Sequence, residues 1–158
     1  MKQTIHKAAV LGAGVMGAQI AAHLANAGIQ TLLFDLGSEG KVSNRIAVEA
    51  LGHLKKLKPA PLASDAILHY LTPCDYDHHL EQLRDCDFVI EAIAERMDFK
   101  KSLYERIAPF LAPEVILASN TSGLPINQLA ESLPTQLKSR FLGVHFFNPP
   151  RYMRLLFL

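Results

Sequence analysis

The sequence feature that most restricts the fold is a set of three glycines, Gly12, Gly14 and Gly17, spaced as GxGxxG. An apolar run at residues 8–11 comes directly before them, and residues 14–27 carry apolar side chains at helical spacing. In a strand–turn–helix unit the first glycine permits the tight turn, the second lets the backbone approach a pyrophosphate, and the third lets the helix pack against the sheet. The amide groups and the dipole at the N-terminus of the helix favour phosphate charge. We therefore predict a dinucleotide cradle at residues 12–17.

An acidic residue follows the three glycines at a spacing typical of dinucleotide-binding folds. Asp35 stands 18 residues after Gly17, at the end of a second apolar run, 31–34. A carboxylate there accepts hydrogen bonds from the adenosine ribose and repels a 2′-phosphate, so NAD is favoured over NADP. Lys41 and Arg45 follow within one loop and keep NADP open as an alternative. A glycine-rich turn without a ligand is the other interpretation, which the register of strand, helix and acid disfavours.

Apolar runs and helical patterns alternate along the whole chain. Strands are expected at residues 8–11, 31–34, 71–72, 88–90, 115–118 and 141–145, and helices at residues 14–27, 44–57, 98–111 and 125–133. Asp98 is the expected cap of the third helix. This alternation predicts parallel strands joined by right-handed crossovers. We expect one α/β domain over residues 1–158, a Rossmann-type doubly wound, mainly parallel sheet with helices on both faces.

The composition excludes several classes of protein. The 158 residues are 49% hydrophobic and 20% charged, with a net charge of +1, which suits one globular domain. The densest basic cluster, Lys55, Lys56 and Lys58, is interpreted as a solvated helix face, so no nucleic-acid partner is expected. No apolar stretch reaches the ~18 residues of a membrane span, and glycines interrupt the signal-like run near the N-terminus. We expect a soluble, cytoplasmic protein.

The cysteines and the paired histidines point to no metal. Cys74 and Cys86 form no CxxC motif, so two reduced thiols are expected. His78 and His79 are adjacent but lack the further ligands that a metal site needs.

Three further groups of polar residues stand at or shortly after the ends of predicted strands, where sheets of this kind bind ligands, and Lys100 of the first group lies on the helix that follows. They are Glu95 with Lys100, Asn120 with Ser122, and His145 with Asn148. His145 is the one histidine at the carboxyl end of a predicted strand, and a histidine suits a general base because it changes charge near neutral pH. Surface charge is the alternative for the first group, and turn or cap chemistry is the alternative for the second.

The segments GAGVMG, EAIAERMDFKK, ASNTSG and HFFNPPRYM occur in this order. Together they resemble the NAD-binding domain of the L-3-hydroxyacyl-CoA dehydrogenases over nearly the whole chain. The resemblance implies oxidation of a 3-hydroxyacyl-CoA to a 3-ketoacyl-CoA with NAD, a step of fatty-acid β-oxidation. It implies that His145 is the catalytic base and that Ser122 forms a hydrogen bond to the substrate oxygen. It further implies that the cofactor site includes Asp35, Glu95, Lys100, Asn120 and Asn148.

The chain departs from this family at its C-terminus. The family places a glutamate that pairs with the catalytic histidine where this chain has Phe157. Such an acid fixes the imidazole tautomer and stabilises the imidazolium. The family's second, helical domain, which completes the acyl-CoA pocket and forms the dimer, is expected to be absent, so this would be a truncated chain with very low turnover alone.

Two other functions stay open. One is an NAD enzyme that acts on free 3-hydroxy acids, which would share GxGxMG without ASNTS and HFFNP. The other is a non-catalytic NAD-binding or interaction module, consistent with Phe157. A homo-oligomer is a further expectation, because apolar residues 155–158 are candidates to associate. Contact of the lysines at 55, 56 and 58 with CoA phosphates also stays open.

Overall fold

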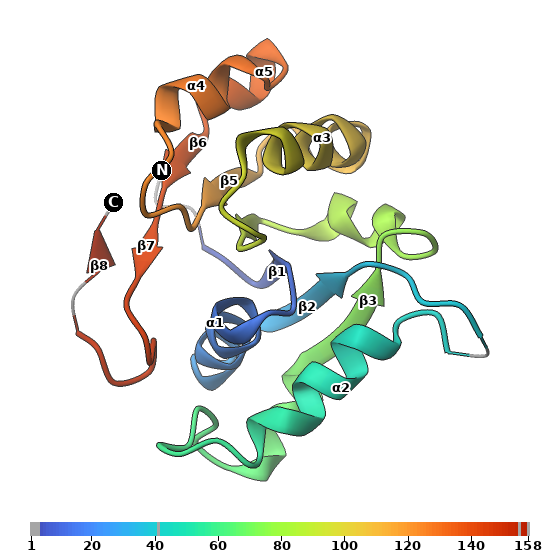
Figure 1. Cartoon of the computed structure of the whole chain (residues 1–158), viewed down its shortest axis with the longest axis vertical. Coiled ribbons are helices and arrows are strands. Elements are labelled where there is room, and N and C mark those ends of the chain that lie inside the picture. Colours follow the sequence, from blue (N-terminus) through green and yellow to red (C-terminus); the bar gives the residue numbers. More distant parts are fainter. Residues whose placement is uncertain (1–3, 41, 155, 158) are drawn as a thin grey trace.

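The computed structural model describes residues 4–40, 42–154 and 156–157. Its main sheet has six parallel strands in the order β3-β2-β1-β4-β5-β6 (Figure 1). These strands are β1 (Lys7–Leu11), β2 (Gln30–Asp35), β3 (Leu71–Asp75), β4 (Phe88–Glu91), β5 (Ile116–Ser119) and β6 (Phe141–Gly143). The α-helices are α1 (Val15–Asn26), α2 (Arg45–Leu54), α3 (Met97–Ile107), α4 (Ile126–Glu131) and α5 (Thr135–Lys138). The chain winds outward from β1 in both directions, which confirms the predicted doubly wound α/β fold.

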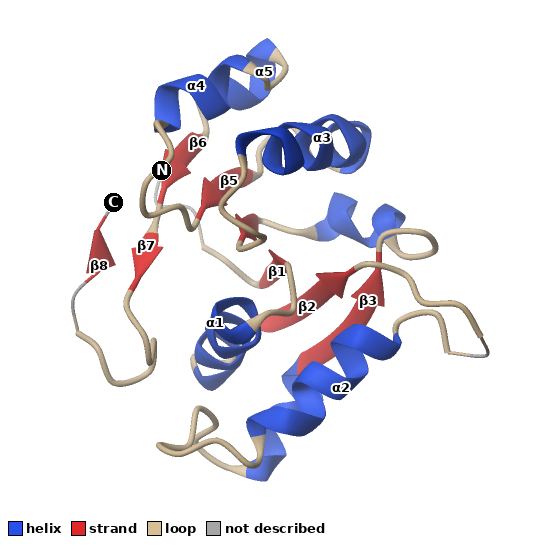
Figure 2. Ribbon diagram, in the orientation of Figure 1, coloured by secondary structure: helices blue, strands red, loops and turns tan. Residues whose placement is uncertain are grey.

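Helices cover both faces of the sheet, as the ribbon in Figure 2 shows. Alternate residues of β1 serve the two cores: Ala9 and Leu11 lie in one, and Val10 lies in the other. The first core includes residues of α3, α4 and α5, and the second includes residues of α1 and α2. Strands buried on both faces must be apolar along their whole length, which is why the sequence shows short continuous runs instead of alternation.

Several predicted boundaries were wrong. Helix α2 ends at Leu54, so Lys55, Lys56 and Lys58 are exposed in the segment after the helix and do not form one of its faces. Helix α3 begins at Met97 with Arg96 as its N-cap, so Asp98 lies in the first turn. Strand β3 extends to Asp75, and its Pro73 is tolerated because β3 is an edge strand. Three 3₁₀ helices, Asp65–Tyr70, Leu80–Asp85 and Ala108–Phe110, and helix α5 were not predicted.

The last predicted strand divides in two, and this moves His145 out of the main sheet. Strand β6 ends at Gly143, and His145 begins β7 (His145–Phe146), which pairs antiparallel with β8 (Leu156–Phe157). The Val144 amide still donates to the Ser119 carbonyl at 3.0 Å. The Phe146 amide donates instead to the side-chain oxygen of Asn120 at 2.9 Å, so the chain leaves the β5 edge.

Within the described part of the chain, no helix combines the length and the apolar character that crossing a membrane requires. Cys74 and Cys86 are free and buried, as expected. Burial raises the pKa of both thiols to about 12, so they are poor nucleophiles.

Candidate functional site

The three glycines lie at the carboxyl edge of the sheet, and each has a different environment. Gly12 has φ +108°, and a Cβ there would lie 2.8 Å from the Ala92 carbonyl oxygen. A Cβ on Gly17 would lie 1.8 Å from the Gly12 carbonyl oxygen. Gly14 has no atom within 4 Å of its Cβ position. The outer two glycines are therefore required by packing, whereas Gly14 faces open space in which a ligand can approach the backbone.

Asp35 ends β2 beside the glycine loop. Its Oδ2 accepts a hydrogen bond from the Ala13 amide at 2.6 Å, and its Oδ1 accepts one from the Leu36 amide at 2.7 Å. Each carboxylate oxygen has further lone pairs, so the group can also accept from a ligand hydroxyl. Asp35 thus supports the glycine loop and remains available to the adjoining pocket.

Two pockets adjoin at this edge of the sheet. The first, which we call the Asp35 pocket, has a volume of about 580 Å³ and is lined by Gly12, Gly14, Asp35, Leu36, Tyr76, Ala92, Ile93, Ala94, Phe99, Ser102, Leu103 and Arg106. The second, which we call the His145 pocket, has about 520 Å³ and is lined by Gly14, Val15, Met16, Ala92, Ile93, Ala94, Glu95, Asn120, Ser122, His145, Phe146, Phe147 and Asn148. The pockets share Gly14 and residues 92–94, so together they make one path across the ends of the strands.

Glu95 lies in the His145 pocket and organises the loop after β5. Its Oε1 accepts hydrogen bonds from the Thr121 hydroxyl at 2.5 Å, the Gly123 amide at 2.8 Å and the Ser122 amide at 2.9 Å. Burial alone would raise the pKa of Glu95, but these donors and the nearby Lys100 ammonium outweigh it and hold the pKa at about 2. Glu95 is therefore a fixed negative charge that anchors the Ser122 segment.

Lys100 does not line either pocket. Its side chain is fully buried, and its Nζ lies 2.6 Å from Glu91 Oε1 and 3.5 Å from Glu95 Oε2. The side chain expected at the cofactor site thus lies behind the pocket wall, paired with two carboxylates of the protein, and its part in cofactor binding stays a prediction.

Glu91 is the centre of this buried network, and the sequence did not single it out. Besides Lys100, its carboxylate accepts hydrogen bonds from the Tyr104 hydroxyl at 3.0 Å, the Ser119 hydroxyl at 2.6 Å and the Ile93 amide at 2.7 Å. These bonds connect β4, β5 and α3 directly beneath the shared floor of the two pockets.

The amide side chains of the His145 pocket are held by protein groups. The backbone amide of Asn120 donates to the Glu91 carbonyl at 2.7 Å, while the side-chain oxygen of Asn120 accepts from the backbone amide of Phe146. The side-chain oxygen of Asn148 accepts from Gln19 Nε2 at 3.3 Å. The structure thus brings together Glu95, Asn120, Ser122, His145 and Asn148, which the sequence placed on three separate segments.

His145 is positioned by β7 and lacks a partner on one ring nitrogen. Its Nδ1 is buried and has no hydrogen-bond partner among the described residues. The residue directly opposite His145 across the β7–β8 pair is Phe157. Position 157 is therefore the register partner of His145 in this pair of strands.

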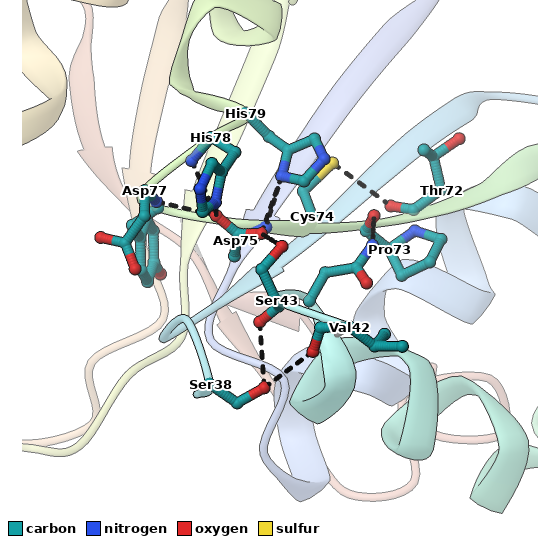
Figure 3. Close-up of polar contacts among 12 residues, drawn as sticks. Ser38, Val42, Ser43, Thr72, Pro73, Cys74, Asp75, Asp77, His78 and His79 are labelled. Carbon is teal, nitrogen blue, oxygen red and sulfur yellow. Dashed lines mark hydrogen bonds and ion pairs between the residues drawn. The ribbon is translucent and has the colours of Figure 1, made fainter. Parts of the chain in front are cut away.

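The paired histidines belong to a separate polar cluster, drawn in Figure 3. Buried Asp75 accepts hydrogen bonds from the Ser43 hydroxyl at 2.8 Å and from the His78 amide at 2.7 Å. His78 and His79 each place Nδ1 3.0 Å from its carboxylate. Burial would raise the pKa of Asp75, but its donors lower it well below the usual range. The cluster ties the loop after β2 to β3, and the described residues contain no group of three or more side chains suited to hold a metal.

Comparison with known proteins agrees with this geometry. Residues 7–157 match the family described as "3-hydroxyacyl-CoA dehydrogenase, NAD binding domain". The "Putative fatty acid oxidation complex trifunctional enzyme" of Rickettsia felis is 45% identical over 157 residues, which cover 99% of this chain and 22% of that protein. The "Probable 3-hydroxyacyl-CoA dehydrogenase" of Deinococcus radiodurans is 41% identical over 153 residues, or 96% of this chain and 44% of that protein.

A solved structure shows the same fold. The 3-hydroxybutyryl-CoA dehydrogenase of Escherichia coli K12 superposes with a TM-score of 0.80 at 30% identity, covering 98% of this chain and 32% of that one. The chain thus spans less than half the length of each of these three proteins. Both the sequence match and the arrangement of the glycine loop, Asp35 and the two pockets lead to one conclusion: the chain belongs to the 3-hydroxyacyl-CoA dehydrogenase family and corresponds to its NAD-binding domain.

Proposed function

We propose that this chain binds NAD along the path formed by its two pockets, and that the protein to which the domain belongs oxidises L-3-hydroxyacyl-CoA. The adenosine half is assigned to the Asp35 pocket and the nicotinamide half to the His145 pocket. The observation that carries the proposal is Gly14, which lines both pockets and whose Cβ position is open. The pyrophosphate of a dinucleotide would lie in this space, facing the N-terminus of α1.

The residues of the His145 pocket suit the oxidation of a secondary alcohol. When bound, NAD accepts the hydride. Because Nδ1 of His145 is buried, Nε2 is the nitrogen assigned to take the hydroxyl proton. Ser122 supplies a hydroxyl for the substrate oxygen, and Glu95 holds the Ser122 amide in place. Asn120 and Asn148 are assigned to orient the nicotinamide end, and Lys100 acts through Glu95.

The environment of His145 predicts slow turnover. For Nε2 to accept a proton, Nδ1 must carry the other one, and no described group accepts a hydrogen bond from it. Loss of the orienting carboxylate lowers kcat about 10⁴-fold in a serine-protease triad. The same observation favours a second candidate function, a non-catalytic NAD-binding module, in which His145 performs no proton transfer.

Isothermal titration calorimetry with NAD and NADP tests the cofactor assignment. We expect NAD to bind more tightly than NADP, and Asp35→Ala to weaken NAD binding at least about tenfold, because hydrogen bonds to a charged group contribute ~1.5–3 kcal/mol. Asp65→Ala, at an exposed carboxylate distant in sequence from both pockets, is the matched control and should bind as the unmodified chain does.

Gly14→Ala tests the position of the pyrophosphate. Its new methyl group meets no protein atom, so the melting temperature should stay nearly unchanged while NAD affinity falls. Undiminished NAD binding by Gly14→Ala would contradict the position of the pyrophosphate. Absence of NAD binding by the unmodified, folded chain would refute the proposed function itself.

A further inference from the structure

Tyr76 is a pocket residue to which neither the sequence motifs nor the proposed function assigns a role. It directly follows β3, and its amide donates to the Asp35 carbonyl at 3.2 Å. Its ring stacks on Phe34 with centroids 5.7 Å apart and an interplanar angle of 23°. Tyr76 is only 4% exposed, yet it lines the Asp35 pocket. The ring is therefore fixed between the core and the pocket, next to the residue assigned to the ribose.

The hydroxyl of Tyr76 is an unsatisfied donor. It is buried and has no hydrogen-bond partner among the described residues. A buried hydroxyl without a partner costs ~1–3 kcal/mol, so its presence in a pocket wall needs an explanation. Burial and the negative charges of Asp35 and Glu91 raise the pKa of Tyr76, so the phenol keeps its proton. Tyr76 thus combines a place in the pocket wall with a protonated hydroxyl that no described protein group accepts from.

Arg106 of α3 completes this side of the pocket. Its Nη2 donates to the Tyr76 carbonyl at 2.8 Å and to Asp77 Oδ1 at 2.7 Å, and its Cζ lies 5.7 Å from the centre of the Tyr76 ring. Two acceptors thus hold the guanidinium at the pocket wall, where its planar face can lie against a flat heterocycle. The rest of the lining is largely apolar, including Leu36, Ile93 and Phe99, as suits a purine.

We propose that Tyr76 is a specificity-determining residue for the cofactor, whose hydroxyl donates a hydrogen bond to the adenosine half of the dinucleotide while Arg106 covers the purine. This inference rests on the proposed function, because it takes the Asp35 pocket as the adenosine site. It adds a second polar contact beside Asp35. Asp35 accepts from the ribose, and Tyr76 donates to an acceptor of the same nucleoside, so the two side chains recognise complementary atoms.

Tyr76→Phe isolates the hydroxyl because it leaves the ring stack in place. Calorimetric titration should show affinity for NAD and for ADP-ribose weakened about 3- to 10-fold, the range of one net hydrogen bond. Affinity for nicotinamide mononucleotide, which lacks adenosine, should not change. The free variant should melt at the same temperature as the unmodified chain or higher, because an unpaired buried hydroxyl has been removed.

Tyr104→Phe is the matched control for stability, since its hydroxyl is equally buried but is bonded to Glu91. It should melt at a lower temperature. Unchanged NAD and ADP-ribose affinity in Tyr76→Phe would overturn the inference while leaving NAD binding intact. A fall in the melting temperature of Tyr76→Phe without NAD present would also overturn it, because the hydroxyl would then have a protein partner. If the unmodified chain bound no NAD, the proposed function would fail and the inference with it.

Discussion

Replacement of Lys100 by methionine should destabilise the domain more than most single substitutions. The side chains of Lys100 and Glu91 are both fully buried and their charged atoms lie 2.6 Å apart. Methionine has nearly the same length and fills the space, but it carries no charge and donates no hydrogen bond. The substitution therefore leaves the Glu91 carboxylate buried with only neutral donors, those of Tyr104, Ser119 and Ile93.

The magnitude follows from this arrangement. Removing one partner of a buried ion pair costs ~3–5 kcal/mol, because the remaining charge is left uncompensated. The three neutral donors to Glu91 and the half-exposed Glu95, which also loses its ion pair, place the expected loss near the lower bound, at about 3 kcal/mol. For a domain of this length, each kcal/mol lowers the melting temperature by ~2–4 °C, so a decrease of about 6–12 °C is expected.

Urea denaturation followed by circular dichroism measures the free energy of unfolding of each variant. Lys101→Met is the matched control: it is the next residue of α3, it is only partly buried, and it should change stability by less than ~0.5 kcal/mol. Adding Glu91→Gln to Lys100→Met removes the uncompensated charge and should recover part of the loss. A loss below about 1 kcal/mol in Lys100→Met would refute the reasoning, because it would mean that the pair contributes no more than an exposed one.

Three further predictions concern the glycine loop, Glu95 and Phe157. Gly17→Ala should lower stability by at least ~1–3 kcal/mol because its Cβ would overlap the Gly12 carbonyl oxygen, whereas Gly52→Ala, in an open position of α2, should raise it; equal melting temperatures would contradict this. Since the folded pKa of Glu95 is about 2 against an ordinary 4.5, its contribution to stability is complete above pH 4.5 and is lost as the pH falls toward 2. Glu95→Gln should therefore lose less stability than the unmodified chain between pH 5 and pH 3, while Glu39→Gln, on an exposed loop, should follow the unmodified chain; parallel curves for Glu95→Gln would contradict the assignment. Phe157→Glu should supply an acceptor for Nδ1 of His145, so that this nitrogen carries the proton, and should raise the rate of 3-hydroxybutyryl-CoA oxidation at least about tenfold. The ¹⁵N spectrum of the imidazole reports which nitrogen is protonated. An unchanged spectrum would show that a side chain at position 157 does not reach the imidazole.

The parts of the site that could be predicted from the sequence are local ones. Gly12, Gly14 and Gly17 act within one turn, and Asp35 ends the strand that pairs with the strand before that turn. Their arrangement depends on contacts between neighbouring elements, so motif spacing was sufficient to predict where they lie. The parallel sheet could be predicted equally well, because each strand is a short apolar run and each crossover contains a helical pattern.

The buried network was missed because its partners come from three segments. Glu91, Lys100 and Ser119 are ordinary surface residue types in a sequence, and only the pairing of β4 with β5 and the packing of α3 bring them together. One signal was available. Lys100 stands at the start of the series 100, 103, 104, 107, whose other members are Leu103, Tyr104 and Ile107, and all four are buried. A lysine on the apolar stripe of a helix requires a buried acid, and Glu91 at the end of a buried strand was a candidate.

His145 shows why the chemistry of this site is less predictable than its cofactor binding. The sequence placed His145 at the end of a main-sheet strand, but the structure places it in the β7–β8 pair, with position 157 directly across from it. His145 therefore depends on the segment that supplies β8, whereas the glycine loop, Asp35 and Tyr76 are positioned by β1, β2, β3, the start of α1 and contacts with Ala92 and Arg106. We thus expect a substitution in β8 to change the surroundings of His145 without disturbing the Asp35 pocket. This separation is the physical reason to expect that a substitution at position 157 leaves NAD binding unchanged.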